Sequence, residues 1–309
     1  MLSYYRKFRM KKIILSLSLF ALVLLAAAGG HVLYLFNHRE FGFKDFHHPF
    51  VLGVDRAIAP DEQVKKETAE ILKQKFSYLS YGGQMTVYES QDKKYVIKFF
   101  NPRSVIKKSW FFQFAKLRRL NSLKWITNTY FRKQQRLKKY FLRYEMAFLD
   151  LKEETGLVYV HLDPSTCLSQ NLEVVDKEGN LHHIELDAYP FVLQKKVELT
   201  MHHLDRLLNN GDVAGAKESV QQIYNLFLSR AEKGYTDRLQ TLHKNYGFFE
   251  GKAVQLDVGR IRKSAAIAEN PLKEMERIIS NITPSLAEPF PKLSSVLQER
   301  LKNDELSKR

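Results

Sequence analysis

Three polar residues in the second half of the chain have the types that a metal–nucleotide site requires. Asp237, Asn245 and Asp257 follow one another in that order. Phosphoryl transfer needs one carboxylate near the acceptor hydroxyl, and an asparagine with a second carboxylate to hold the Mg²⁺ that bridges the phosphates. The sequence therefore predicts ATP and Mg²⁺ as cofactors, with Asn245 and Asp257 as metal ligands and Asp237 beside the acceptor.

A short hairpin is expected to bring the two metal ligands together. Residues 246–249 and 253–256 are strand-like, and a Glu250–Gly251 turn lies between them. The two ends of a hairpin meet at one end of a two-stranded ribbon. Asn245 and Asp257 should therefore lie close together although twelve residues separate them.

Upstream of this hairpin lie residues suited to binding phosphates. Gly82 and Gly83 separate two strand-like stretches of residues 76–89, and Lys98 lies in a third strand, residues 95–100. Glycines let the backbone approach phosphate oxygens, and a strand lysine can reach the same phosphates as a point charge. A helical stretch, residues 144–151, then carries Glu145 where a carboxylate partner for Lys98 would lie.

The order of these parts resembles that of the protein-kinase-like superfamily, at its divergent end, which includes bacterial membrane-anchored kinase-like proteins. The matching parts are a glycine-rich loop, a strand lysine, a helix glutamate, a hinge near Gln194 and Lys195, a catalytic loop and a metal aspartate. The resemblance covers about residues 76–262. It implies an α+β, two-lobed kinase-like fold in which Lys98, Glu145 and Asp237 are catalytic. Gln194, with the two glycines, is then expected beside the nucleotide.

Departures from the family pattern leave a second function open. When Val87 is aligned with the final Val of the G-x-G-x-x-G-x-V pattern, only Gly82 falls on one of its glycines. Tyr235 stands in place of the catalytic-loop histidine, and Val258 takes the Phe position of D-F-G. Asn245 also follows the catalytic-loop aspartate by eight residues instead of five. The alternative is a catalytically inactive pseudokinase that acts as a membrane-proximal binding or scaffold module.

The short C-terminal part bears on the acceptor. Only fifty residues follow Gly259, with no A-P-E-like segment. Two helices are expected there, about Pro271–Ile282 and Leu293–Asn303, separated by prolines that include Pro284. A C-lobe of residues 196–290 with a tail of 291–309 is too small for a peptide-docking platform, whereas residues 76–195 would form the N-lobe. An active enzyme is therefore predicted to phosphorylate a small or lipid-linked acceptor.

The N-terminus predicts a membrane anchor. Ile13–Phe36 is an apolar stretch of 24 residues, and a basic tail of residues 1–12 precedes it. At about 1.5 Å per residue the stretch exceeds the roughly 30 Å hydrocarbon layer. A single transmembrane helix is therefore expected, with a signal peptide cleaved near Ala28 as the alternative. Five cations before the span, against three in the twenty residues after it, favour a cytoplasmic N-terminus and leave the side of the globular domain open.

The basic charge of the chain is localised. Residues 103–143 contain thirteen Lys and Arg, nine aromatic residues and no Asp or Glu, in a chain of net charge +15. In kinase terms this segment is an insertion in the N-lobe. Apolar and aromatic residues at helical spacing with cations between them predict an interfacial helix that binds anionic lipid. Packing of the aromatics against the N-lobe and binding of single-stranded nucleic acid are the alternatives.

The composition excludes some other classes of site. The 309 residues are 44% hydrophobic, enough for one domain with a full core after a linker and helix of residues 37–75. Cys167 is the single cysteine, so no disulfide can form within a monomer. The histidines occur mostly as adjacent pairs, such as His202 and His203, which lack the spacing of zinc ligands.

Overall fold

The computed structural model describes residues 17–31, 61–101, 124–163 and 168–307. The chain divides into two compact units, Met1–Phe41 and Gly42–Arg309. In the first unit, residues 17–31 form a helix whose side chains are exposed. Among the described residues, no helix is both long enough and apolar enough to cross a membrane. Both ends of the predicted span Ile13–Phe36 lie outside the described residues, so the anchor stays a prediction.

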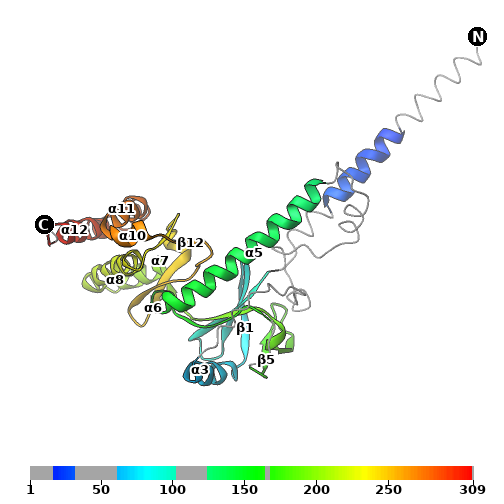
Figure 1. Cartoon of the computed structure of the whole chain (residues 1–309), viewed down its shortest axis with the longest axis horizontal. Coiled ribbons are helices and arrows are strands. Elements are labelled where there is room, and N and C mark those ends of the chain that lie inside the picture. The colour runs from blue at the N-terminus through cyan, green and yellow to red at the C-terminus, as the bar shows by residue number, and fades with distance from the viewer. Residues whose placement is uncertain (1–16, 32–60, 102–123, 164–167, 308–309) are drawn as a thin grey trace, which may run out of the picture. The chain divides into compact units, whose positions relative to one another are not determined.

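The second unit is built on a seven-stranded mixed sheet, which Figure 1 shows beside a long helix. The strands are β1 (Phe76–Tyr81), β2 (Met85–Ser90), β3 (Tyr95–Phe100), β4 (Leu157–His161), β5 (Asn171–Val175), β6 (Leu181–Glu185) and β7 (Phe191–Lys195). Their order is β4-β7-β3-β2-β1-β5-β6, and only the β1–β5 pair is parallel. The predicted α+β class is confirmed.

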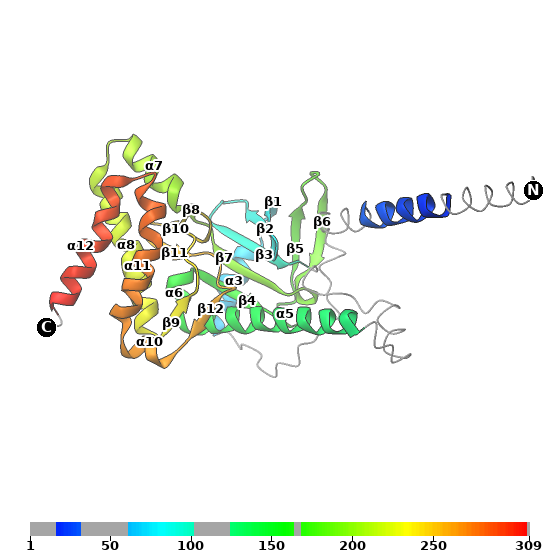
Figure 2. The ribbon, with the colours of Figure 1, turned by 90° about the horizontal axis from the view of Figure 1, so that it is seen from above.

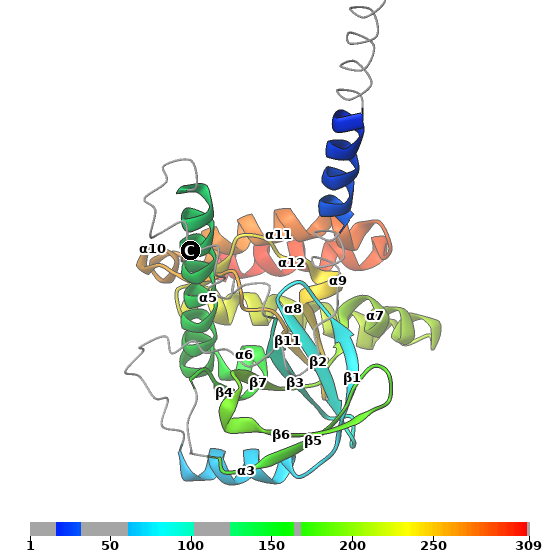
Figure 3. The same cartoon turned by 90° about the vertical axis from the view of Figure 1, so that its right-hand side faces the viewer.

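Two helices pack beside this sheet. The long helix, α5 (Lys124–Asp150), buries Leu137, Phe141, Tyr144 and Phe148, which recur at the three- and four-residue spacing of one helix face. The ring centroid of Phe141 lies 4.6 Å from that of Phe100 on β3. The other helix is α3 (Glu62–Leu72), and the side chain of Asp61 caps its N-terminus. It lies at the end of the unit away from the C-terminal helices (Figure 1 and Figure 3).

The C-terminal half is mainly helical, and Figure 2 shows its helices grouped at the end of the unit opposite β5 and β6. Its elements follow β7 and are β8 (Glu198–Leu199), α7 (Thr200–Asn209), α8 (Val213–Glu232), β9 (Tyr235–Asp237), α9 (Leu242–Asn245), β10 (Tyr246–Phe249), β11 (Lys252–Gln255), β12 (Ile261–Lys263), α10 (Ala265–Glu269), α11 (Pro271–Ala287) and α12 (Pro291–Ser307), whereas the short helix α6 (Lys152–Thr155) lies earlier, between α5 and β4. Their core includes Phe227, Ile278 and Leu297. This core is separate from the one that α5 forms with the sheet.

One boundary predicted from the sequence is wrong. Pro284 was expected to separate two helices, but it lies inside α11, which continues to Ala287. A proline within a helix removes one backbone hydrogen bond. The hydroxyl groups on either side donate to other carbonyls of the same helix: Thr283 Oγ1 to Ile279 O at 2.7 Å and Ser285 Oγ to Ile282 O at 2.8 Å. By contrast, Gly234 ends α8 with a φ of 78°, as its predicted role of left-handed cap requires.

Candidate functional site

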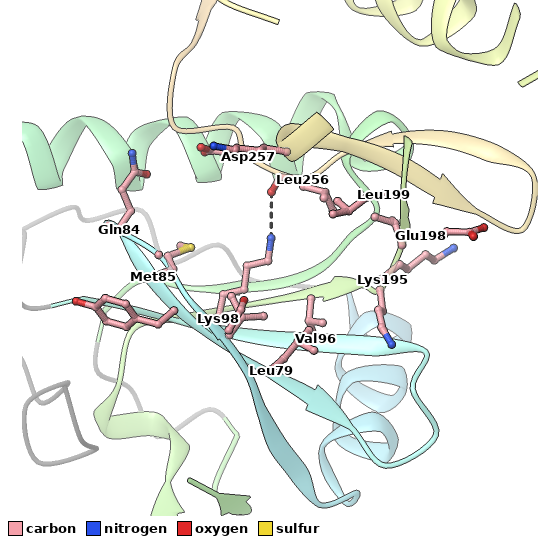
Figure 4. Close-up of a pocket in the computed structure, with 18 of the residues that line it drawn as sticks. Leu79, Gln84, Met85, Val96, Lys98, Lys195, Glu198, Leu199, Leu256 and Asp257 are labelled. Atoms are coloured by element: carbon pink, nitrogen blue, oxygen red, sulfur yellow. Dashed lines mark hydrogen bonds between the residues drawn. The ribbon is translucent and has the colours of Figure 1, made fainter. Parts of the chain in front are cut away.

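A cavity of about 910 Å³ lies between the sheet and the segment that follows β11. Its wall combines the Gly82–Gly83 turn, Lys98 of β3, Tyr144 of α5, the chain from Lys195 to Leu199, and Leu256 with Asp257. Figure 4 shows Lys98 and Asp257 from these separate elements beside the same space. Leu79, Val87 and Val96 make one side of the cavity apolar.

The glycine turn that connects β1 to β2 is held by hydrogen bonds with Met85 and Asn101. Gly82 N donates to Met85 O at 2.8 Å, and Asn101 Nδ2 donates to Gly82 O at 2.5 Å. Neither glycine has a positive φ, and a Cβ added at Gly83 would meet no atom within 4 Å. The fold itself therefore does not require glycine at position 83, and the open side of the turn faces the cavity.

Lys98 is a buried cation in the wall of this cavity. Its Nζ donates to Leu256 O at 3.0 Å, the bond drawn in Figure 4. Burial lowers the pKa of Lys98 to about 8, and the charge of Asp257 opposes that shift. The lysine is therefore still mostly protonated at neutral pH and is available to an anionic ligand.

The predicted pair of Lys98 and Glu145 is not formed in this structure. Both residues are buried, but no ion pair joins them among the described residues. Neighbouring residues of a helix point about 100° apart, and it is Tyr144 that faces the cavity while donating to Met85 Sδ at 3.4 Å. Tyr144, and not Glu145, is therefore the residue of α5 that lines the cavity beside Lys98.

Side chains from three elements hold the segment that carries Asp257. Lys98 binds the carbonyl of Leu256, Gln255 Nε2 donates to Asp257 O at 2.8 Å, and Arg143 of α5 donates to Gly259 O. The Asp257 side chain accepts from Gly259 N through Oδ1 at 2.7 Å. Its carboxylate is thus fixed beside the cavity by its own turn.

The predicted ribbon between Asn245 and Asp257 is present. Strands β10 and β11 pair from Tyr246 with Gln255 to Phe249 with Lys252, and Leu256 N donates to Asn245 O at 2.7 Å. Asn245 is therefore hydrogen-bonded to Leu256, the residue before Asp257. The cavity wall includes Lys244 but not Asn245 itself. A carboxylate and an amide oxygen suit Mg²⁺, which commonly takes few protein ligands besides phosphates and water. No cluster of three His, Cys, Asp or Glu side chains suited to a metal occurs in the described ranges.

Asp237 lies deeper than the other two polar residues. It is 1% exposed at the end of β9, where it pairs with Ile261 of β12, and it is not part of the cavity wall. Its carbonyl accepts from Gln240 Nε2 at 2.7 Å and from Arg277 Nη2 at 3.0 Å. Burial raises the pKa of the Asp237 carboxyl, the charge of Arg230 lowers it, and the charge of Asp257 adds to the increase.

The predicted position of Gln194 beside the nucleotide is not what the structure has. Its side chain is fully buried, and Nε2 donates to Thr155 O at 2.6 Å and to Gln255 O at 3.2 Å. In this segment of the chain, the residues that line the cavity begin with Lys195. A strand places successive side chains on opposite faces, so of the two residues of the expected hinge Gln194 points into the interior and Lys195 lines the cavity.

Two cavity residues were missed in the sequence. Tyr144 adjoins the predicted glutamate, and Glu198 lies just after the hinge. Glu198 accepts from Arg206 Nε at 2.9 Å and Nη2 at 2.8 Å, and it lies 2.8 Å from His203 Nδ1. These contacts lower the pKa of Glu198 to about 2. The His202–His203 pair could have drawn attention to this segment, because His203 is buried and stacked on Phe248 instead of lying at the surface.

Comparison with known proteins adds a likeness of fold at most. No protein-family model and no curated protein matches this chain. A solved structure titled as the bifunctional kinase-methyltransferase WbdD is similar over 71% of this chain, at 14% identity and a TM-score of 0.32. The chain spans 43% of the length of that structure. At this TM-score the likeness carries no argument about activity. The α+β architecture with its curled mixed sheet is consistent with a kinase-like fold.

Proposed function

We propose that this chain is a two-lobed kinase-like phosphotransferase that binds ATP with Mg²⁺ and transfers the γ-phosphoryl group to a hydroxyl of a small or lipid-linked acceptor. One observation supports the proposal above others. The glycine turn, Lys98 and Asp257, which span 175 residues of sequence between Gly82 and Asp257, line one cavity of about 910 Å³. Cavities of roughly 300–1,000 Å³ are of the size that binds small ligands.

The walls of the cavity suit the two ends of a nucleotide. Leu79, Val87 and Val96 provide an apolar surface for a flat base. At the other end, the open side of the Gly82–Gly83 turn lets phosphate oxygens approach the backbone. The Lys98 ammonium provides a positive charge for the same phosphates.

The polar residues opposite the sheet would hold the metal and orient the acceptor. Asp257 and Asn245 are the oxygen ligands proposed for Mg²⁺, which neutralises phosphate charge when bound. Asp237 is the proposed group that takes or orients the acceptor proton. Burial raises its pKa, and a carboxylate with a raised pKa is a better general base near neutral pH.

The test is thermal unfolding of the full chain with and without Mg-ATP. A ligand that binds only the folded state stabilises it by about 2.7 kcal/mol at one hundred times its Kd. The midpoint of unfolding should therefore rise by about 5 °C. Asp257→Asn should lose most of this rise, whereas Asp205→Asn, at an exposed aspartate of α7, should keep it. No rise in the unchanged protein at millimolar Mg-ATP contradicts the proposal.

A second candidate function is a catalytically inactive scaffold with the same fold. Two observations favour it: Lys98 is bound to Leu256 O and not to Glu145, and Asp237 lies outside the cavity wall. A chain that binds Mg-ATP but hydrolyses none and phosphorylates no acceptor in an acceptor screen would support the scaffold. Turnover that Asp237→Asn abolishes would exclude it.

The proposed function includes a membrane location. The described apolar helix of residues 17–31 leaves Leu22 and Leu25 exposed at 67% and 72%, and an apolar helix exposed all round needs an apolar environment. Arg136, Lys138 and Lys139 on α5 are exposed cations at the end of the basic segment, most of which lies outside the described residues. We expect the chain from Gly42 onward to float with anionic vesicles at low salt and not with neutral ones. Binding to single-stranded nucleic acid without vesicle binding would contradict this location.

A further inference from the structure

Arg230 is a charged residue of the core that the proposed function leaves unused. This arginine lies near the end of α8 and is 1% exposed. Its Nη1 donates to Tyr246 Oη at 3.2 Å, and its guanidinium lies 5.6 Å from the ring centroid of Phe227. Within the described residues, Nε and Nη2 are buried and make no hydrogen bond.

A buried arginine with unused donors is unusual. A guanidinium carries five N–H donors and stays charged at every physiological pH. Burying a charge is strongly unfavourable unless an opposite charge compensates it. The hydroxyl of Tyr246 provides one hydrogen bond and no full charge, so it does not account for the presence of Arg230 in this core.

Asp237 is a buried carboxylate at the end of β9, the strand that follows α8 and packs against it. The charge of Arg230 lowers the pKa of the Asp237 carboxyl, against the effect of burial. The same two charges act in opposite directions on the pKa of Tyr246, which Arg230 lowers and Asp237 raises, so the three groups lie in one electrostatic environment. No ion pair within 4.0 Å joins Arg230 to Asp237 among the described residues. The carboxylate instead accepts from backbone amides, including Leu239 N at 3.4 Å.

Other charged groups around Asp237 do not replace Arg230. Arg277 of α11 contacts the carbonyl of Asp237, but Glu274 accepts from it at 3.0 Å and 2.5 Å and balances its charge. Asp257, which follows β11, raises the pKa of the Asp237 carboxyl further. The charge of Asp237 also raises the pKa of Arg277, so this second cation attracts the carboxylate as well. Among the effects that lower the pKa of the Asp237 carboxyl, however, the charge of Arg230 is the largest.

We propose that Arg230 is a positioning residue for phosphoryl transfer: a permanent positive charge, buried in the same core as Asp237, that keeps this carboxylate ionised. The inference rests on the proposed function, because it assigns Asp237 the acceptor proton. Arg230 does not line the cavity, so it touches neither nucleotide nor acceptor. It acts through the carboxylate alone, since a buried aspartate without a counter-charge would hold its proton and could not accept another.

A double-mutant cycle on the full chain tests the coupling without any activity. Arg230→Met removes the charge and keeps the length of the side chain, and Asp237→Asn removes the opposite charge. If the two charges compensate each other, each single variant lowers the midpoint of unfolding. The midpoint of the double variant is then lowered by less than the sum of the two single effects. Additive losses overturn the proposal. If Arg230→Met does not fold, the double variant is expected to fold, and failure of both also overturns it.

Tyr246→Phe is the matched control for a purely structural role. It removes the hydrogen bond of Arg230 but leaves both charges in place. Arg230→Met should move the acidic limb of the pH profile of phosphoryl transfer to higher pH, because loss of the cation raises the pKa of Asp237, whereas Tyr246→Phe should leave the limb in place. Equal shifts in the two variants would contradict the proposal. The absence of transfer in the unchanged protein would contradict the proposed function, and the unfolding cycle would still decide the role of Arg230.

Discussion

Replacement of Lys98 by methionine is predicted to stabilise the free protein while destroying its response to nucleotide. Burial lowers the pKa of this lysine from 10.5 to about 8. At about 1.36 kcal/mol per unit, the buried ammonium destabilises the fold by about 3 kcal/mol at neutral pH. The loss of its bond to Leu256 O offsets about 1 kcal/mol of the gain. Lys98→Met should therefore be more stable by roughly 2 kcal/mol, a rise of a few degrees in the midpoint of unfolding.

The stability difference between Lys98→Met and the unchanged protein should change with pH in one direction. Since the folded-state pKa of Lys98 is lowered, the unfolded chain binds one more proton than the folded chain between about pH 8 and 10.5. Stability contributed by this group then rises with pH across that window. The advantage of Lys98→Met over the unchanged protein should accordingly shrink from pH 7 to pH 10.

The assay is thermal unfolding of both proteins from pH 7 to pH 10, with and without Mg-ATP. Lys217→Met, at an exposed lysine of α8, is the matched control and should change neither the midpoint nor its pH dependence. A Lys98→Met variant that is less stable at pH 7, by an amount that does not vary with pH, would refute the reasoning. That result would mean that the ammonium is compensated in the folded state.

Three further perturbations test other parts of the site. Gly83→Ala should leave the midpoint of unfolding within about 1 °C, because the added Cβ meets no atom within 4 Å, yet weaken Mg-ATP binding about tenfold in calorimetry by narrowing the approach to the turn. Arg143→Met should weaken the Mg²⁺ dependence of ATP binding, because it releases the Gly259 carbonyl next to the metal aspartate. Glu198→Gln should be less stable than the unchanged protein at pH 7 by about 1 kcal/mol, after allowance for solvent screening. The pKa of Glu198 is lowered to about 2, so its contribution to stability is present above the ordinary glutamate pKa and is lost as the pH falls toward 2. Acid unfolding followed by circular dichroism should therefore show that the difference in stability between the two proteins disappears toward pH 2.

Local sequence signals predicted the parts of the fold that depend on neighbours along the chain. The β10–β11 ribbon follows from its Glu250–Gly251 turn between two apolar stretches, and the end of α8 follows from Gly234. Strand β3 was expected from the apolar residues around Lys98. Each of these features is fixed by backbone conformation or by alternation within a few residues.

Features that depend on tertiary packing could not be predicted in the same way. The rotation of α5, which directs Tyr144 instead of Glu145 into the cavity, is set by how its aromatic residues pack on Phe100. The inward direction of Gln194 depends on the carbonyls of Thr155 and Gln255, which belong to other elements. No spacing in the sequence indicates these contacts.

The central claim is that Lys98 faces the phosphates of a nucleotide in the cavity that Asp257 also lines. An ATP analogue with a reactive acyl group on its terminal phosphate tests this claim most directly, because a lysine within reach takes the acyl group and the nucleotide leaves. A lysine with a pKa of about 8 has a substantial neutral, nucleophilic fraction at that pH. Peptide mapping by mass spectrometry should find the label on Lys98, lost when Mg-ATP is in excess. Label confined to exposed lysines, or label on Lys98 that excess Mg-ATP does not reduce, would contradict the account.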